Sequence, residues 1–255
     1  MTTLDLSPAP GAAPTAGRIW AHGRTEAMLL ARNGEQLLLA LVIPVVLLLL
    51  GRFAGGRVGL DDPNLVPPSV FAVAIWSSAF NSLAIATGFE RRYGVLERLS
   101  STPLGRAGLI TGKAVSLLLV TAGQLLVLAV VAFILGWRPV FSVPALLVAI
   151  VAAALAVLAF AAWALVLAGR LRAEITLALG NLIYLIFLIG GAVFLPVAAY
   201  PDVVQPVLSL LPTAALGEAL RHAAAGEIVG WPLAVLSVWA ALGLLVSRKV
   251  FRWSS

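Results

Sequence analysis

Seven charged residues stand out in the polar connector between positions 89 and 113, which separates two long apolar stretches. They are Glu90, Arg91, Arg92, Glu97, Arg98, Arg106 and Lys113. On a helix, the seven-residue spacing of Glu90 and Glu97, and of Arg91 and Arg98, places the acids and the bases in two parallel rows. The chemistry that this pattern favours is ionic recognition of a soluble partner.

A helical wheel started at Phe89 gathers the apolar residues of this connector on one arc: Phe89, Tyr93, Val95, Leu96 and Leu99. The opposite arc carries the charges, and only Arg92 falls among the apolar residues, where its long stem can snorkel. Pro103 disfavours helical geometry at Thr102 and is expected to end the helix. We predict one short amphipathic helix with an exposed charged side. The alternative is a solvated basic loop that only sets the topology.

Other kinds of site are not supported by the sequence. Gly108 to Lys113 is one residue short of a phosphate-binding GxxxxGK loop, and Ala114 stands where that loop needs Ser or Thr. His22 and His222 are isolated, so we predict no metal site. No Ser/His/Asp set is visible, so we predict no catalytic residue in this chain.

The composition is that of an all-α integral membrane protein. Hydrophobic residues make up 61% of the chain and charged residues 11%, against roughly 25% charged in soluble domains. The net charge of +6 falls in short loops, which argues against nucleic acid as a partner. Since a membrane-crossing helix needs about 20 mostly apolar residues, we predict six spans, at residues 36–53, 67–88, 114–135, 144–168, 175–196 and 228–246.

The distribution of Lys and Arg predicts that both termini are cytoplasmic. With that orientation the cytoplasmic side holds Arg18, Arg24, Arg32, Arg91, Arg92, Arg98, Arg106, Lys113, Arg170, Arg172, Arg248, Lys249 and Arg252. The other side holds only Arg52, Arg57, Arg138 and Arg221. This asymmetry over short loops is the positive-inside pattern. A multi-pass protein of the plasma or inner membrane follows, with a cytoplasmic tail at 248–255.

Three further segments complete the expected organisation. Residues 1–17 are rich in Ala, Pro and Thr and are expected to be disordered. Residues 18–35 mix apolar and basic side chains, which favours an amphipathic helix in the membrane interface over a solvated lead-in. Residues 197–227 are apolar but interrupted by prolines, so we expect short helices that re-enter the membrane rather than an ordinary surface loop.

Away from their ends, the predicted spans contain no Asp, Glu, Lys, Arg or His. Ion-coupled carriers need such residues at membrane depth, so energy for any uphill transport is expected to enter from outside the spans. Asn81 and Gln124 are expected to form hydrogen bonds between helices.

The connector also carries a family resemblance. Glu90-Arg91, Gly94, Leu96-Glu97-Arg98-Leu99, Thr102-Pro103 and Gly112-Lys113 resemble the signature of ABC-2-type permeases, the membrane subunits of ATP-driven exporters. A second match, Leu211-Pro212-Thr213 followed by Glu218 and Arg221, resembles the family's proline-containing segment before the last span. In the first motif, Val95 departs from the Thr that the family often has after the Gly. Within this family, the chain resembles the daunorubicin-resistance-type permeases.

The resemblance implies a function and partners. The connector helix would be a coupling helix seated on a separate ATP-binding subunit, which holds the ATP and Mg²⁺, and two permease subunits would pair as a homodimer or heterodimer. The residues that would contact the ATP-binding subunit are Glu90, Arg91, Tyr93, Glu97 and Arg98. The substrate, an amphipathic drug or lipid, would pass Trp76, Phe80, Asn81, Tyr184 and Phe187, although packing alone explains such aromatic residues. The alternative function is a non-transporting assembly or immunity factor that docks a soluble partner through the basic connector.

Overall fold

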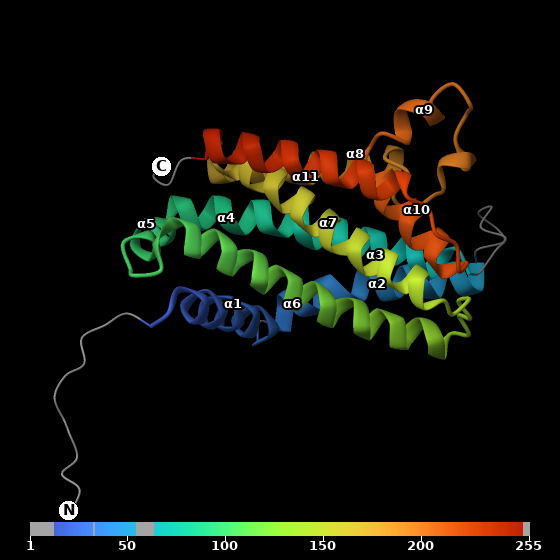
Figure 1. Ribbon diagram of the computed structural model, residues 1–255, viewed down its shortest axis with the longest axis horizontal. Coiled ribbons are helices and arrows are strands. Elements are labelled where there is room, and N and C mark those ends of the chain that lie inside the picture. The colour runs from blue at the N-terminus through green and yellow to red at the C-terminus, as the bar shows by residue number, and fades with distance from the viewer. Residues whose placement is uncertain (1–12, 33, 55–63, 252–255) are drawn as a thin grey trace, which may run out of the picture.

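The computed structural model describes residues 13–32, 34–54 and 64–251, and this part of the chain is helical, with no strand (Figure 1). Helices are expected because a helix satisfies its own backbone hydrogen bonds, which lipid cannot do. The longer elements are α1 (Thr15–Arg32), α2 (Gly34–Ala54), α3 (Val66–Trp76), α4 (Leu83–Arg92), α6 (Gly105–Ile134), α7 (Val143–Ala168), α8 (Ala173–Gly190), α10 (Pro212–Ala224) and α11 (Trp231–Val250).

Five helical stretches are long and apolar enough to cross a membrane: Val66–Arg92, Gly105–Ile134, Val143–Ala168, Ala173–Gly190 and Trp231–Val250. They coincide with the second to sixth predicted spans. The first predicted span coincides with α2, but the apolar part of α2 that the structure describes, Ala40–Phe53, is shorter than a full span. The all-helical membrane class is therefore confirmed, and the count of six stays a prediction.

Two helices differ in extent from the spans predicted for them. α6 begins at Gly105, before the expected position 114. Its first turns carry Arg106 and Lys113, so they are helical but not apolar. Hydropathy locates only the apolar part of such a helix. α8 ends at Gly190 and not at position 196. The chain leaves the helix at Gly191, and Ala192 takes a positive φ of 50°.

The turns of the bundle gather at its two ends (Figure 1). The short helix α5 (Val95–Ser100), the α7–α8 connection and the end of α11 lie at one end, and α9 (Gln205–Leu208) and the start of α11 lie at the other. The basic residues at the α5 end are Arg18, Arg91, Arg92, Arg98, Arg106, Lys113, Arg170, Arg172, Arg248 and Lys249, and those at the opposite end are Arg52, Arg138 and Arg221. Arg57 and Arg252 lie outside the described residues.

Helix α1 packs lengthwise against the first half of α6 (Figure 1). The two helices meet closely because each presents a glycine: a Cβ atom on Gly23 would lie 2.8 Å from the carbonyl oxygen of Gly112, and one on Gly112 would lie 2.4 Å from Cδ2 of His22. The start of α1 at Thr15 makes residues 15–17 helical, whereas we expected them to be disordered; residues 1–12 lie outside the described part of the chain.

The segment between α8 and α11 contains the expected short helices. Of these, α10 packs among α3, α7 and α11, and most of its residues are buried. The apolar side chains around α9 are different: Val203 is 90% exposed, and Val207 and Leu210 are also exposed. Most of α10 is therefore covered by the bundle, whereas the apolar residues around α9 lie on its surface.

Candidate functional site

The connector after α4 reverses direction where we expected one continuous helix. α4 ends at Arg92, and Gly94 takes the left-handed φ of 67° before α5 begins at Val95. Glycine adopts this conformation without the steric cost that a side chain adds. The helical wheel drawn through Gly94 was therefore wrong, because residues before and after the break do not share one helical phase.

Arg91 is the clearest consequence of this break. The wheel placed its side chain on the exposed arc, but Arg91 is buried, with only 7% of its surface accessible. Its guanidinium donates hydrogen bonds to the carbonyl oxygens of Gly169, at 2.6 Å, and of Leu171. The exposed Arg92, expected among the apolar residues, pairs with Glu174 at the start of α8. The end of α4 is thus fastened by Arg91 to the α7–α8 connection and by Arg92 to the start of α8.

Lys113 ties α6 to two other helices. Its Nζ lies 2.8 Å from the carboxylate of Glu90 on α4, and it also donates a hydrogen bond to Glu26 on α1. His22 stands one turn before Glu26, with its Nε2 atom 3.8 Å from the carboxylate. Glu90 is therefore turned inward toward Lys113 rather than outward toward a partner. Because a buried cation needs compensating charges, these carboxylates hold α1 and α4 against α6.

The remaining predicted partner contacts lie on the surface of α5 and the turn before it. Tyr93 is 62% exposed, and Glu97 and Arg98 are exposed as well. Leu96 is fully buried and anchors α5 on the bundle. The geometry thus presents an exposed aromatic residue in the turn and two opposite charges on α5, next to helix α4, which Arg91, Arg92 and Glu90 bind to its neighbours.

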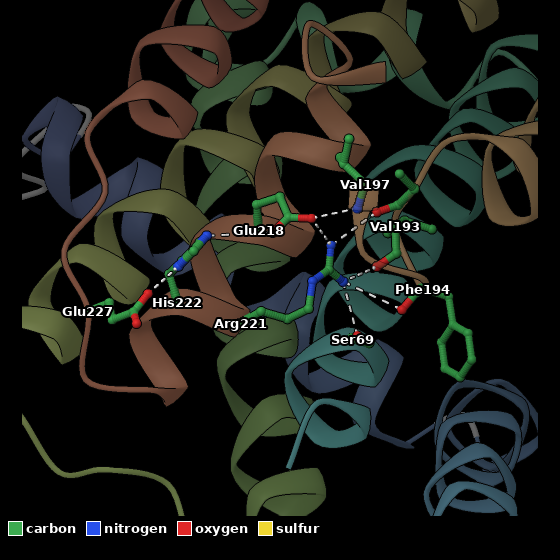
Figure 2. Close-up of polar contacts among 9 residues, drawn as sticks. Ser69, Val193, Phe194, Val197, Glu218, Arg221, His222 and Glu227 are labelled. Atoms are coloured by element: carbon green, nitrogen blue, oxygen red, sulfur yellow. Dashed lines mark hydrogen bonds and ion pairs between the residues drawn. The ribbon is translucent and has the colours of Figure 1, made fainter. Parts of the chain in front are cut away.

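A second polar cluster lies at the opposite end of the bundle and centres on Arg221 of α10 (Figure 2). The Nη1 atom of Arg221 donates to the hydroxyl of Ser69 on α3 at 3.0 Å and to the carbonyl oxygen of Val193 at 3.2 Å. The Nη2 atom donates to the carbonyl oxygen of Ala192 at 3.2 Å and to Glu218 at 3.0 Å. Burial lowers the pKa of Arg221, and the neighbouring Glu218 carboxylate opposes that shift.

Glu218 extends this cluster to the chain that follows α8. Its Oε1 atom accepts a hydrogen bond from the backbone N–H of Val197 at 2.8 Å. On the other side of α10, His222 lies 2.6 Å from Glu227 and 3.7 Å from Glu218 (Figure 2). The cluster therefore fastens α10 to α3 and to residues 192–197.

Comparison with known proteins identifies the chain. Residues 18–224 match the family model described as ABC-2 type transporter, which covers most of the sequence. The chain belongs to the ABC-2 type transporter family. It is therefore a membrane-spanning permease component of an ABC transporter, and such a permease works with an ATP-binding subunit. The search of curated proteins found no match.

The residues expected along a substrate path in this ABC-2 permease come together where α3 and the π-helical turn η2 (Ser77–Ser82) face α8. Trp76 and Phe80 stack with ring centroids 4.4 Å apart, and Phe187 lies 5.8 Å from Trp76. The indole N–H of Trp76 donates to the carbonyl oxygen of Tyr184 at 3.5 Å. Trp76 and Phe80 are each only 4% exposed. In this conformation of the permease they pack as core residues.

The expected hydrogen bonds between helices are confirmed. Asn81 donates to the side-chain oxygen of Asn181 on α8 at 2.9 Å. Gln124 on α6 accepts from Ser78 at 2.9 Å and donates to the carbonyl oxygen of Ala40 on α2 at 2.8 Å. These bonds join η2 to α8 and α6, and α6 to α2, across the permease.

Sequence reasoning missed the Arg221 cluster. Glu218 and Arg221 entered only as part of a motif, without a structural role. The signal was present, since opposite charges three residues apart in an otherwise apolar segment face the same side of a helix. What it does not reveal is that Ser69 and the backbone after α8 supply the other hydrogen-bond partners.

Proposed function

We propose that this permease is part of an exporter of the daunorubicin-resistance type, which moves amphipathic drugs or lipids out of the cell. It would have six spans and cytoplasmic termini, and would pair with a second permease subunit as a homodimer or heterodimer. The ATP-binding subunit, carrying ATP and Mg²⁺, would dock on α5. The observation that carries this proposal is the exposure of Tyr93 in the turn after α4 and of Glu97 and Arg98 on α5, next to the end of α4 that Arg91 and Arg92 hold in place.

The contacts of Arg91 and Lys113 support the proposal that α5 transmits force from the ATP-binding subunit to the membrane helices. Arg91 binds the α7–α8 connection, and Lys113 binds α1 and α4. A push on α5 would therefore be passed to several helices at once instead of bending a loose loop. Ion pairs and charged hydrogen bonds are among the stronger polar contacts in proteins, which suits this role.

The opposite end of the permease would contain the outer gate, formed by α9 and α10. The Arg221 cluster supports this assignment, because its hydrogen bonds join α10 to α3 and to residues 192–197 in the closed arrangement. Movement of these elements would uncover Trp76, Phe80, Asn81, Tyr184 and Phe187, the proposed contacts of the substrate.

Charge reversal on α5 tests the docking proposal. The variant Glu97→Lys should lose most of its capture of the ATP-binding subunit from detergent extracts, and ATP-driven export should fall in parallel. Glu227→Lys makes the same change on an exposed glutamate at the opposite end of the bundle, so it should retain capture of the ATP-binding subunit. If Glu97→Lys captures the ATP-binding subunit and exports substrate as well as the wild type does, the proposal of docking through α5 is wrong.

A further inference from the structure

A cavity of about 270 Å³ lies where α2 and α6 end and α3 begins, and the proposed function makes no use of it. Its walls include two arginines and a tryptophan, Arg52, Arg138 and Trp137, together with apolar residues such as Leu48, Val66 and Ala132. The volume is just below the roughly 300–1,000 Å³ of pockets that enclose drug-sized ligands. It is therefore suited to a small polar group rather than to a whole drug molecule.

Both arginines have hydrogen-bond donors to spare. Arg52 donates from Nε to the carbonyl oxygen of Leu135 at 3.0 Å, and Arg138 donates from Nη1 to the carbonyl oxygen of Trp137 at 3.0 Å. These bonds cap the end of α6. They leave both Nη atoms of Arg52, and Nε and Nη2 of Arg138, without a hydrogen bond within the described residues. In that same part of the chain neither arginine forms an ion pair with a carboxylate. Arginine's planar array of N–H groups matches phosphate geometry well.

Trp137 supplies a third donor. Its Nε1 atom is buried, and no acceptor for it is found among the residues that the structure describes. The ring is held in place by Phe71, 5.5 Å away and perpendicular, and by Phe133, 5.2 Å away. An indole nitrogen can only donate a hydrogen bond, and a buried donor without an acceptor is costly. Donor groups of three residues that line one cavity, with no acidic side chain among the described residues that line it, indicate a ligand rich in acceptors and negatively charged.

The position of the cavity indicates what carries that negative group. Trp is enriched where membrane helices reach the headgroup layer, and Trp137 stands just past the end of the long apolar helix α6. Toward the middle of the membrane, both helices present apolar side chains outward: Val46 and Leu50 on α2, and Val130 and Ile134 on α6, all at least 44% exposed. Acyl chains lying on this surface would bring a lipid phosphate to the level of the arginines.

We propose that this cavity binds the phosphodiester group of a phospholipid, with Arg52 and Arg138 as its cationic contacts and the indole N–H of Trp137 as a neutral donor. Capping of α6 alone would account for one donor of each arginine. It does not account for the cavity between them or for the buried indole N–H. The proposal requires only that the chain spans a membrane, and is independent of docking through α5 and of the transported substrate.

Native mass spectrometry of the purified full-length chain in detergent tests this site. Three probes are titrated separately: phosphatidylglycerol, diacylglycerol with the same acyl chains, and inorganic phosphate. Phosphatidylglycerol should bind the wild-type chain, and the double variant Arg52→Gln/Arg138→Gln should weaken this binding by about tenfold or more, the factor expected from losing charged hydrogen bonds. Trp137→Phe keeps the ring, removes the N–H, and should weaken binding by about threefold. Binding of diacylglycerol should be the same in the wild type, in the double arginine variant and in Trp137→Phe.

Arg170→Gln/Arg172→Gln is the matched control, because it removes the same two charges from the α7–α8 connection at the other end of the bundle. It should bind phosphatidylglycerol as the wild type does. Thermal unfolding without lipid shows whether each variant is folded, and the stabilisation that added phosphatidylglycerol gives the wild type should be lost only in the Arg52/Arg138 variant. If the chain binds inorganic phosphate through these arginines but does not bind phosphatidylglycerol, the ligand is a soluble anion and the lipid proposal is wrong. Unchanged phosphatidylglycerol binding by a folded Arg52/Arg138 variant would overturn the site.

Discussion

Arg221 donates a hydrogen bond from Nη2 to Oε1 of Glu218 across 3.0 Å, one turn away on α10; the arginine side chain is buried and the glutamate side chain is 12% exposed. The same carboxylate oxygen accepts from the backbone of Val197, and the same guanidinium reaches Ser69 on α3. One ion pair thus joins three parts of the chain. Gly217 leaves room for the guanidinium of Arg221, because a Cβ atom at position 217 would lie 2.6 Å from it.

Replacing Arg221 should destabilise the protein strongly. Arg221→Met removes the buried guanidinium that pairs with the partly buried Glu218 and also binds Ser69, and breaking a buried ion pair costs about 3–5 kcal/mol. The measurement is the thermal unfolding midpoint in detergent, with Arg98→Met as the control, since Arg98 is exposed and surface changes cost within about 0.5 kcal/mol. Equal midpoints for the two variants would contradict a structural role for the cluster.

Replacing Lys113 should release α1 from the bundle. In Lys113→Met the carboxylates of Glu26 and Glu90 lose the cation between them, so α1 loses its ionic attachment to α6. Backbone hydrogen exchange in residues 15–32 should accelerate, while exchange in α7 stays as in the wild type. Lys113→Arg keeps the charge and should show a smaller effect. Unchanged exchange in α1 would mean that packing alone holds this helix.

The contact between α1 and α6 should not tolerate a side chain at Gly23. Gly23→Ala brings a Cβ atom to 2.8 Å from the backbone oxygen of Gly112 and from Val115, so the helices must move apart. Overpacking of this kind costs about 1–3 kcal/mol. Gly17→Ala makes the same substitution on α1 where no atom lies within 4 Å. Unfolding midpoints should fall for Gly23→Ala only; an equal or higher midpoint for that variant would refute the close contact.

The turn between α4 and α5 should depend on the residue at position 94. Gly94→Ala forces a side chain into a left-handed conformation, at a cost of about 1–2 kcal/mol, although no neighbouring atom obstructs the new Cβ. We expect α5 to shift and capture of the ATP-binding subunit to weaken. Gly94→Asn is the control, because Asn tolerates this conformation better than Ala. If both variants capture the ATP-binding subunit like the wild type, the conformation at Gly94 does not matter for docking.

The sequence predicted some site residues well and others poorly, for local reasons. Glu97 and Arg98 are exposed as expected, because both lie within α5, where a helical wheel is valid. Arg91 was placed on the wrong side because the wheel was drawn through Gly94, and the sequence does not state which glycines take a left-handed turn. Nor does the sequence show that Lys113 is buried against Glu26 and Glu90.

The membrane class, the positions of the helices and the uneven distribution of Lys and Arg were determined by the sequence itself. They depend on hydropathy, helix length and loop charge, which are properties of short continuous segments. Only the tertiary structure decided which distant residues meet. Lys113 pairs with Glu26 across 87 positions, and Arg221 reaches Ser69 across 152. Such pairs form because helices pack in one particular arrangement, and that arrangement results from contacts summed over the whole bundle, which no local pattern encodes.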